Sequence, residues 1–198
     1  VRELINASYI INSLKTTKAP TVSIQTLLQY EGSVIKEVKL GLTHGSAVAE
    51  GANLTKDLGN LPPNICTPTY LATVAKDIAK QYGMKTKIFD KKQIEQLRMG
   101  SFLSVDKGSR EAPKFITIEH SLGLKKQKLS VLVGKGITCD AGGISIKPSA
   151  DMDEMKYDMG GAASVLGVMK TIGALKLPIN VVALIPSCEN LPDGLALK

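Results

Sequence analysis

The second half of the sequence alternates between short apolar runs and segments of helical periodicity, and this alternation limits the possible folds more than any other feature. Residues 129–133 (LSVLV) are apolar except for Ser130, and such a run is typical of a strand buried on both faces. Strands that alternate with helices at this spacing form βαβ units. We therefore predict an α/β fold with a mainly parallel or mixed sheet flanked by helices. The expected strands are 85–89, 114–119, 129–133 and 179–185, and the expected helices are 91–98 and 160–175.

The first part of the chain carries signals for helices, for one strand and for one boundary. The run GNLPPN at 59–64 is rich in residues that cannot continue a helix, so we place a domain boundary near it. Capping residues define a helix just after this run. The expected elements are a helix over 2–15, a strand over 21–28 and a mostly helical segment over 32–58. A further helix is expected to begin after a cap at Thr67 or Thr69, to reach about residue 81 and to end at Gly83.

Charge and composition exclude some classes of protein. The net charge is +7, but the lysines are spread along the chain, and the absence of Trp with only 4% aromatic residues leaves little for base stacking. A solvated lysine-rich surface is therefore favoured, and nucleic-acid binding is possible but not favoured. No stretch approaches the roughly 20 apolar residues of a membrane span, so no membrane partner is expected. Cys66, Cys139 and Cys188 form no CxxC pair, which indicates free thiols in a reducing compartment and hence a cytoplasmic protein.

Segment 133–161 carries the candidate chemistry. It begins where a predicted strand ends, and ligands of open α/β sheets bind beyond the carboxyl ends of strands. Glycines between its charged residues allow the backbone to turn sharply, so the charged side chains can converge if the loop folds back. Carboxylates suit divalent cations, which makes a metal site one interpretation. The candidate residues are Lys135, Asp140, Lys147 and Asp158.

Plainer interpretations of the same residues stay open. Asp158 could cap a helix that begins near Gly160, and the two lysines could lie on the surface. Asp151, Asp153 and Glu154 are expected to form a solvated acidic turn. On the pattern alone, the metal site and these structural roles remain alternatives.

Nucleotide and thiol chemistry fit this segment poorly. The GxxxxGK[ST] motif would need Gly at position 129 and Ser or Thr at 136, where the chain has Leu129 and Gly136. No GxGxxG fingerprint follows the strand, because position 139 is Cys. A catalytic Cys139 would need an activating base, and neither His44 nor His120 is adjacent in sequence. A histidine-based triad or zinc site is therefore not favoured.

As a block, VGKGITCDAGGISIKPSADMDEMKYDMGG at 133–161 resembles the signature of the leucyl aminopeptidase (cytosol aminopeptidase) family. The resemblance spans about residues 46–198. It implies three parts: the carboxyl-terminal part of an amino-terminal α/β domain (1–45), a linking helix (46–62), and the amino-terminal part of a catalytic metallopeptidase domain (63–198), truncated before the second metal-ligand motif. Further matching runs lie at 50–58, 64–68, 177–182 and 186–192.

The resemblance also implies a function and a role for each site residue. Family members release the amino-terminal residue of peptides, leucine or similar, with a water activated by two Zn²⁺ or Mn²⁺ ions per subunit, and are typically homohexamers. By motif position, Lys135 would bind a metal through its amine, Asp140 would bridge both metals and Asp158 would bind one. Lys147 would be the catalytic lysine that stabilises the oxyanion, and Met155 would line the pocket for the first side chain of the substrate.

Two departures from the family pattern have consequences. The usual Phe-Asp-Ser-Gly-Gly is Cys-Asp-Ala-Gly-Gly at 139–143, which preserves the ligand and alters its neighbours. The later Asn-Thr-Asp-Ala-Glu-Gly-Arg motif, which supplies further carboxylates, does not occur before Lys198, so we expect an incomplete fragment that is inactive alone. The alternative is a non-catalytic or DNA-binding regulatory homologue with a degenerate metal site.

Overall fold

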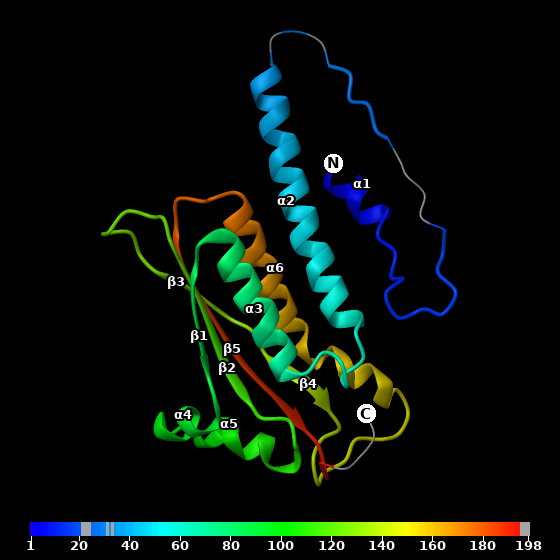
Figure 1. Cartoon of the computed structure of the whole chain (residues 1–198), viewed down its shortest axis with the longest axis vertical. Coiled ribbons are helices and arrows are strands. Elements are labelled where there is room, and N and C mark those ends of the chain that lie inside the picture. Colours follow the sequence, from blue (N-terminus) through cyan, green and yellow to red (C-terminus); the bar gives the residue numbers. More distant parts are fainter. Residues whose placement is uncertain (21–24, 31, 33, 195–198) are drawn as a thin grey trace.

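The computed structural model describes residues 1–20, 25–30, 32 and 34–194. A mixed sheet carries α3 and α6 on one face, the long helix α2 packs across α6, and α1 lies beside α2 (Figure 1). The helices are α1 (Arg2–Ala7), α2 (Ile35–Asn60), α3 (Pro68–Tyr82), α4 (Lys91–Gln96), α5 (Gly100–Val105) and α6 (Gly160–Ala174), with 3-10 helices η1 (Asp106–Gly108) and η2 (Met152–Met159). The strands are β1 (Lys85–Phe89), β2 (Lys114–Ser121), β3 (Ser130–Val133), β4 (Gly136–Asp140) and β5 (Asn180–Asn190).

The sheet is built around β5. Its order is β1-β2-β5-β3, and β4 pairs with β5 on the same side as β3. The β1–β2 and β2–β5 pairs are antiparallel, whereas β3 and β4 run parallel to β5. Of the two arrangements predicted, the mixed sheet is confirmed, because β2 runs antiparallel to β5 along most of the length of β5.

The main core lies between the sheet and helices α3 and α6. Leu71, Ala75 and Ile78 recur at the spacing that places them on one face of α3, and all three are buried. They meet apolar residues of β2 and β5 such as Ile116 and Ala183. The apolar face of α3 therefore holds the helix against the sheet.

The limits predicted for α3 are confirmed. The Thr67 side chain accepts a hydrogen bond from the backbone N–H of Tyr70 at 3.2 Å, which satisfies one of the free donors at the start of the helix. Gly83 follows the last turn with φ of 66°, a left-handed conformation that glycine adopts at little cost. Local signals alone therefore set both ends of this helix.

Helices α2 and α6 approach each other through glycine. A Cβ atom on Gly167 would lie 2.5 Å from the carbonyl oxygen of Gly51 and would also collide with the hydroxyl of Thr55. At the same crossing, the hydroxyl of Thr55 donates to the carbonyl of Ala163 at 3.2 Å, and that of Thr171 donates to the carbonyl of Ala47 at 3.1 Å. The two backbones pack this closely because neither glycine carries a side chain.

Predictions for the first thirty residues were partly wrong. The helix expected over 2–15 ends at Ala7. Beyond it, the Tyr9 hydroxyl donates to Asp57 on α2 at 2.7 Å, so contacts with α2 replace further helical turns. Of the strand expected over 21–28, residues 21–24 lie outside the described residues, and residues 25–28 form neither helix nor strand.

The burial predicted for 129–133 was also wrong. Val131 and Val133 are 51% and 69% exposed, because alternate side chains of a strand point to opposite faces and it is Leu132, between them, that packs against the core. The short strand β4 and the helix α5 were not predicted, and β5 continues five residues past its predicted end at Ile185 to reach Asn190. No helix in the described part of the chain is long and apolar enough to cross a membrane.

Candidate functional site

The four charged residues predicted from the sequence lie together and form an alternating ring of charges, here called the ionic cluster. The amine of Lys135 lies 3.7 Å from Asp140 Oδ2 and 3.3 Å from Asp158 Oδ1. The amine of Lys147 lies 3.4 Å from Asp140 Oδ2 and 3.2 Å from Asp158 Oδ2. Each carboxylate thus faces both lysines, and the loop folds back as the sequence required.

Four segments bring these side chains together. Lys135 lies between β3 and β4, Asp140 is the last residue of β4, Lys147 lies in the loop between β4 and η2, and Asp158 lies in η2 just before α6. The backbone N–H of Ala162, in the first turn of α6, donates to the carbonyl of Lys135 at 2.9 Å. A Cβ on Gly134 would lie 2.7 Å from the carbonyl of Gly161, so glycine permits this contact. The start of α6 is thereby fixed against the end of β3.

The two oxygens of the Asp140 carboxylate face different partners. Oδ1 accepts hydrogen bonds from the side-chain amide of Asn190 at 2.8 Å and from the backbone N–H of Gly142 at 3.2 Å. Oδ2 faces the amines of Lys135 and Lys147. The protein scaffold thus holds one oxygen and leaves the other directed into the ionic cluster.

Charges in the cluster shift the pKa values of Asp140 and Lys147. Burial alone would raise the pKa of Asp140, but the hydrogen bond from Asn190 and the charge of Lys147 outweigh it, so the pKa lies below its usual range. Burial alone would lower the pKa of Lys147, but the hydrogen bond to Asp158 and the charges of both carboxylates raise it. Lys147 is therefore held as the ammonium ion.

Met155, expected from the resemblance to line a substrate pocket, also contacts the ionic cluster. Its sulfur accepts a hydrogen bond from the amine of Lys147 at 2.9 Å. Asp158 does not cap α6, because the N-cap residue of that helix is Met159 and no side chain caps it. The acidic residues Asp153 and Glu154 are exposed, as predicted, although η2 orders them rather than a simple turn.

The ionic cluster offers part of a divalent metal site. Asp140 Oδ2, the Asp158 carboxylate and the Lys135 amine converge, and carboxylate oxygens with a neutral amine nitrogen suit a borderline cation. Within residues 1–20, 25–30, 32 and 34–194, no group of three or more His, Cys, Asp and Glu side chains is arranged to hold a metal ion. The residues present fit one end of a metal centre, and a second ion would need additional carboxylates.

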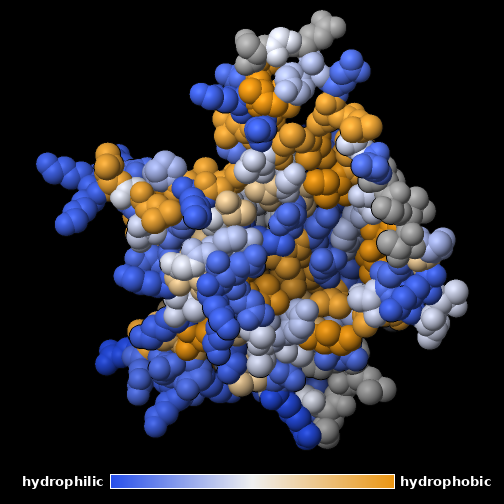
Figure 2. Space-filling model, turned by 45° about the horizontal axis from the view of Figure 1, so that its top comes forward, coloured by the Kyte–Doolittle hydropathy of each residue, from blue (hydrophilic) through white to orange (hydrophobic). Residues whose placement is uncertain are grey.

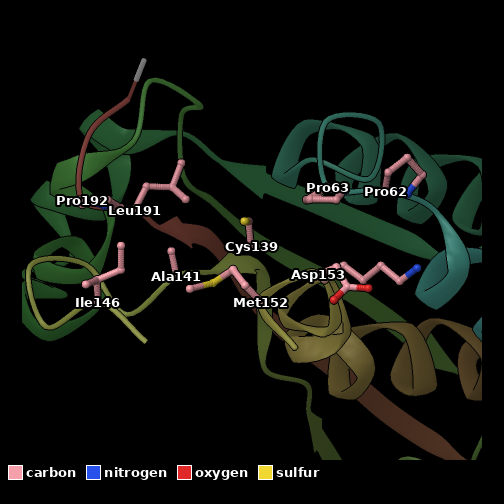
Figure 3. A pocket seen from close by; sticks show the side chains of 10 residues that line it. Pro62, Pro63, Cys139, Ala141, Ile146, Met152, Asp153, Leu191 and Pro192 are labelled. Carbon is pink, nitrogen blue, oxygen red and sulfur yellow. The ribbon is translucent and has the colours of Figure 1, made fainter. Parts of the chain in front are cut away.

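A separate apolar pocket of about 510 Å³ adjoins the ionic cluster (Figure 3). Cys139 and Ala141, which flank Asp140 in the chain, line this pocket together with residues that follow α2, residues that follow β5, and residues of the loop after β4 and of η2. Asp140 does not line the pocket. Residues 139 and 141 therefore contribute to the pocket, and the residue between them contributes to the ionic cluster. The other lining residues are Pro62, Pro63, Ile146, Met152, Asp153, Lys156, Leu191 and Pro192.

The histidines take no part in the ionic cluster. His120 is buried on β2, where its Nε2 lies 2.8 Å from the carbonyl oxygen of Leu177. His44 lies exposed on α2. Both fit the structural or surface roles expected of them. On the face shown in Figure 2, hydrophilic residues are spread over much of the surface between hydrophobic areas, as a solvated surface requires.

Two features near the site were not predicted from the sequence. One is the hydrogen bond from Asn190 to Asp140, since the two residues are fifty positions apart. The other is a pair of buried carboxylates, Asp106 and Glu189, which accept hydrogen bonds from Lys91 at 3.0 Å and from Ser109 at 2.6 Å, respectively. Burial raises the pKa of Asp106 above its usual value. A polar residue at the end of an apolar strand was the only sequence signal for either feature.

Comparisons with known proteins define the class. The chain matches the family model described as the cytosol aminopeptidase family, catalytic domain, over residues 53–198. It is 53% identical over 195 residues to a probable cytosol aminopeptidase of Herminiimonas arsenicoxydans, covering 98% of this chain and 39% of that protein. It is 57% identical over 166 residues to a probable cytosol aminopeptidase of Methylobacillus flagellatus, covering 84% and 34% of the two chains.

Solved structures agree with this assignment. The cytosol aminopeptidase of Coxiella burnetii is similar with a TM-score of 0.80 and 30% identity, over 96% of this chain and 39% of that chain. The bottromycin maturation enzyme BotP in complex with Mn is similar with a TM-score of 0.81 and 28% identity, over 100% of this chain and 40% of that chain.

The mixed sheet flanked by helices, with charged residues at the strand ends, is therefore the fold of a peptidase catalytic domain. More particularly, the chain belongs to the cytosol aminopeptidase family. Two of these relatives, from Herminiimonas and Coxiella, match nearly the whole of this chain, and the chain spans about two fifths of their length.

Proposed function

We propose that the protein is a metal-dependent aminopeptidase that releases the amino-terminal residue, leucine or similar, from peptides. The observation that carries this proposal is the convergence of two carboxylates and two lysines at the ends of β3 and β4. Family membership supports the reaction class. The alternative, a DNA-binding homologue with a degenerate site, is not favoured, because every ligand residue expected in this part of the chain is present.

The two lysines have different roles in this proposal. Lys135 would hold a metal ion through its amine, with the carboxylates of Asp140 and Asp158 as its neighbours. Lys147 stays protonated, which its raised pKa favours, and stabilises the negative charge that develops on the scissile carbonyl oxygen. Bound divalent ions would lower the pKa of a water so that it attacks near neutral pH. The residues of this chain hold that centre in place and supply the fixed positive charge.

Met155 is proposed to line the pocket for the first side chain of the substrate. Its thioether contacts the Lys147 amine, so an apolar side chain packed on Met155 would lie beside the group that stabilises the oxyanion. Methionine suits such a position because its flexible side chain adapts to apolar groups of different shape. This arrangement favours leucine-like residues at the amino terminus of the peptide.

The proposed centre takes two ions, Zn²⁺ or Mn²⁺, and needs carboxylates beyond Asp140 and Asp158. The chain spans 39% of its Herminiimonas relative, which leaves room in that protein for further ligands. A manganese complex of the similar enzyme BotP supports Mn²⁺ as one candidate. We also propose a cytoplasmic homo-oligomer, a hexamer as the family resemblance implies. On its own, the 198-residue chain should retain metal weakly and turn over little or no peptide.

Metal removal tests the proposal. The protein as its gene encodes it is dialysed against a chelator, assayed for hydrolysis of leucine amide, and assayed again after addition of Mn²⁺ or Zn²⁺. We expect activity to disappear with the bound metal and to return with either ion. Unchanged hydrolysis by protein from which all metal has been removed would refute the proposal.

A matched pair of variants locates the site. Asp158→Asn removes a carboxylate of the ionic cluster, and Asp153→Asn removes an exposed carboxylate five residues away. Loss of a ligand should weaken metal binding at least as much as loss of an outer-shell partner, about 10–100-fold. Asp153→Asn should bind metal as the wild type does. Equal effects of the two substitutions would contradict the placement of the site.

A further inference from the structure

The two oxygens of Asp140 are not equivalent. Two N–H groups, from Asn190 and Gly142, donate to Oδ1 at 2.8 and 3.2 Å. Among the described residues, no backbone or amide N–H donates to Oδ2, which lies 3.4 and 3.7 Å from the amines of Lys147 and Lys135. A carboxylate held through one oxygen cannot rotate freely about its terminal bond, so its second oxygen has a fixed direction.

Asn190 is itself held firmly in place. It ends β5 in register with Asp140 at the end of β4, and the backbone N–H of Ala141 donates to its carbonyl at 2.9 Å. The preceding residue, Glu189, is fully buried and accepts a hydrogen bond from Ser109 at 2.6 Å. The backbone of Asn190 is thus tied to β4 on one side and to the loop after η1 on the other.

The loop after Asp140 leaves space for the amide. Gly143 has φ of 66°, and a Cβ atom there would lie 2.8 Å from the Asn190 side-chain oxygen. Any residue but glycine would both strain the backbone and press on the amide. Gly143 therefore makes room for the Asn190 side chain beside Asp140.

We propose that Asn190 is a positioning residue: its amide fixes the Asp140 carboxylate so that Oδ2 points into the metal centre. This inference rests on the proposed function and adds a residue to which that function assigns no role. Asn190 touches neither metal nor substrate. Because its amide already orients the Asp140 carboxylate, Asp140 would lose less conformational entropy on binding a cation. Outer-shell partners that orient ligands raise metal affinity.

The test replaces Asn190 by Leu, which has a similar size and no hydrogen-bonding group, in the protein as its gene encodes it. The matched control is Asn180→Leu at the opposite end of the same strand. The Asn180 side chain also makes two hydrogen bonds: it accepts one from the backbone N–H of Gly123 at 3.1 Å and donates one to the carbonyl of Leu124 at 3.0 Å. Mn²⁺ affinity is measured by titration of the metal-free proteins, with free Mn²⁺ followed by electron paramagnetic resonance.

We expect Asn190→Leu to bind Mn²⁺ about 10–100-fold more weakly and Asn180→Leu to bind it within twofold of the wild type. Saturating Mn²⁺ should restore most of the kcat of Asn190→Leu with KM unchanged, because the substrate contacts are intact. Asn190→Ala, a smaller change, repeats the measurement if the Leu variant folds poorly.

The outcomes separate the two proposals. Wild-type affinity in both Asn190 variants, with normal metal-dependent activity of the wild type, would overturn the positioning role and leave the proposed function standing. A comparable loss of affinity in Asn180→Leu would show a general effect of destabilising β5 and would also overturn it. A wild-type protein that binds no Mn²⁺ would overturn both.

Discussion

Replacement of Gly167 by Ala tests the close crossing of α2 and α6. The added Cβ would lie 2.5 Å from the carbonyl oxygen of Gly51, whereas ordinary van der Waals contact begins at 3.4 Å, so the helices must separate by about 1 Å. Overpacking typically costs about 1–3 kcal/mol, and the upper end applies here because a backbone carbonyl cannot rotate away. Alanine gains about 1 kcal/mol over glycine in helix propensity. The free energy of unfolding should therefore fall by about 2 kcal/mol.

Urea unfolding followed by far-ultraviolet circular dichroism measures this change, and Gly41→Ala is the control. Gly41 is exposed on α2, and apart from its chain neighbours and its own helix backbone no atom of the described residues lies within 4 Å of the position of its Cβ, so the same chemical change should stabilise that helix by up to about 1 kcal/mol. The two substitutions should thus have opposite signs. A Gly167→Ala protein as stable as the wild type, or more stable, would refute the packing argument.

The remaining predictions concern the charged residues. Lys147→Ala should leave the metal content nearly intact and lower kcat by about 10²–10³. Lys135→Ala should lose metal, and its activity should recover partly in excess metal. Elemental analysis with steady-state kinetics checks both variants, and the reverse pattern would show that the two roles are exchanged. The folded-state pKa of Asp140 is lowered, so its contribution to stability is present above the unfolded value of about 3.9 and is lost as pH falls through the folded value. Unfolding of metal-free Asp140→Asn should accordingly depend less on pH below about 4 than that of the wild type, and parallel pH profiles would contradict this.

Elements with strong local signals could be predicted from the sequence. Helix α3 has a Thr67 cap, an apolar face of spacing three to four and a terminal Gly83, all within one stretch of chain. The apolar run of β3 was equally clear, but its burial was not, because burial depends on what lies beside a strand rather than on its own residues. The last part of β5 has the polar sequence SCEN and was missed, since its strand conformation depends on pairing with β4, about fifty residues earlier.

The candidate site divides in the same way. Lys135, Asp140, Lys147 and Asp158 lie within one stretch of sequence, 133–161, so glycine spacing and the family signature together located them. The partner of Asp140 could not be found by such means, because Asn190 reaches it only through the parallel register of β4 and β5. Single-sequence patterns identify candidate ligands that lie close together in the sequence and miss a partner that reaches them from another strand.

The ring of two lysines and two carboxylates has a consequence for ion selectivity. With all four groups ionised the ring is electrically neutral, so it does not attract cations through excess negative charge. An entering ion must compete with ammonium groups and gain enough from an amine nitrogen to displace a proton from it. Hard cations such as Ca²⁺ and Mg²⁺ gain little from nitrogen, whereas borderline ions such as Zn²⁺ gain more. These four side chains by themselves would therefore favour borderline ions such as Zn²⁺ over Ca²⁺ and Mg²⁺, and binding of a harder ion such as Mn²⁺ would depend more on the additional carboxylates of the proposed centre.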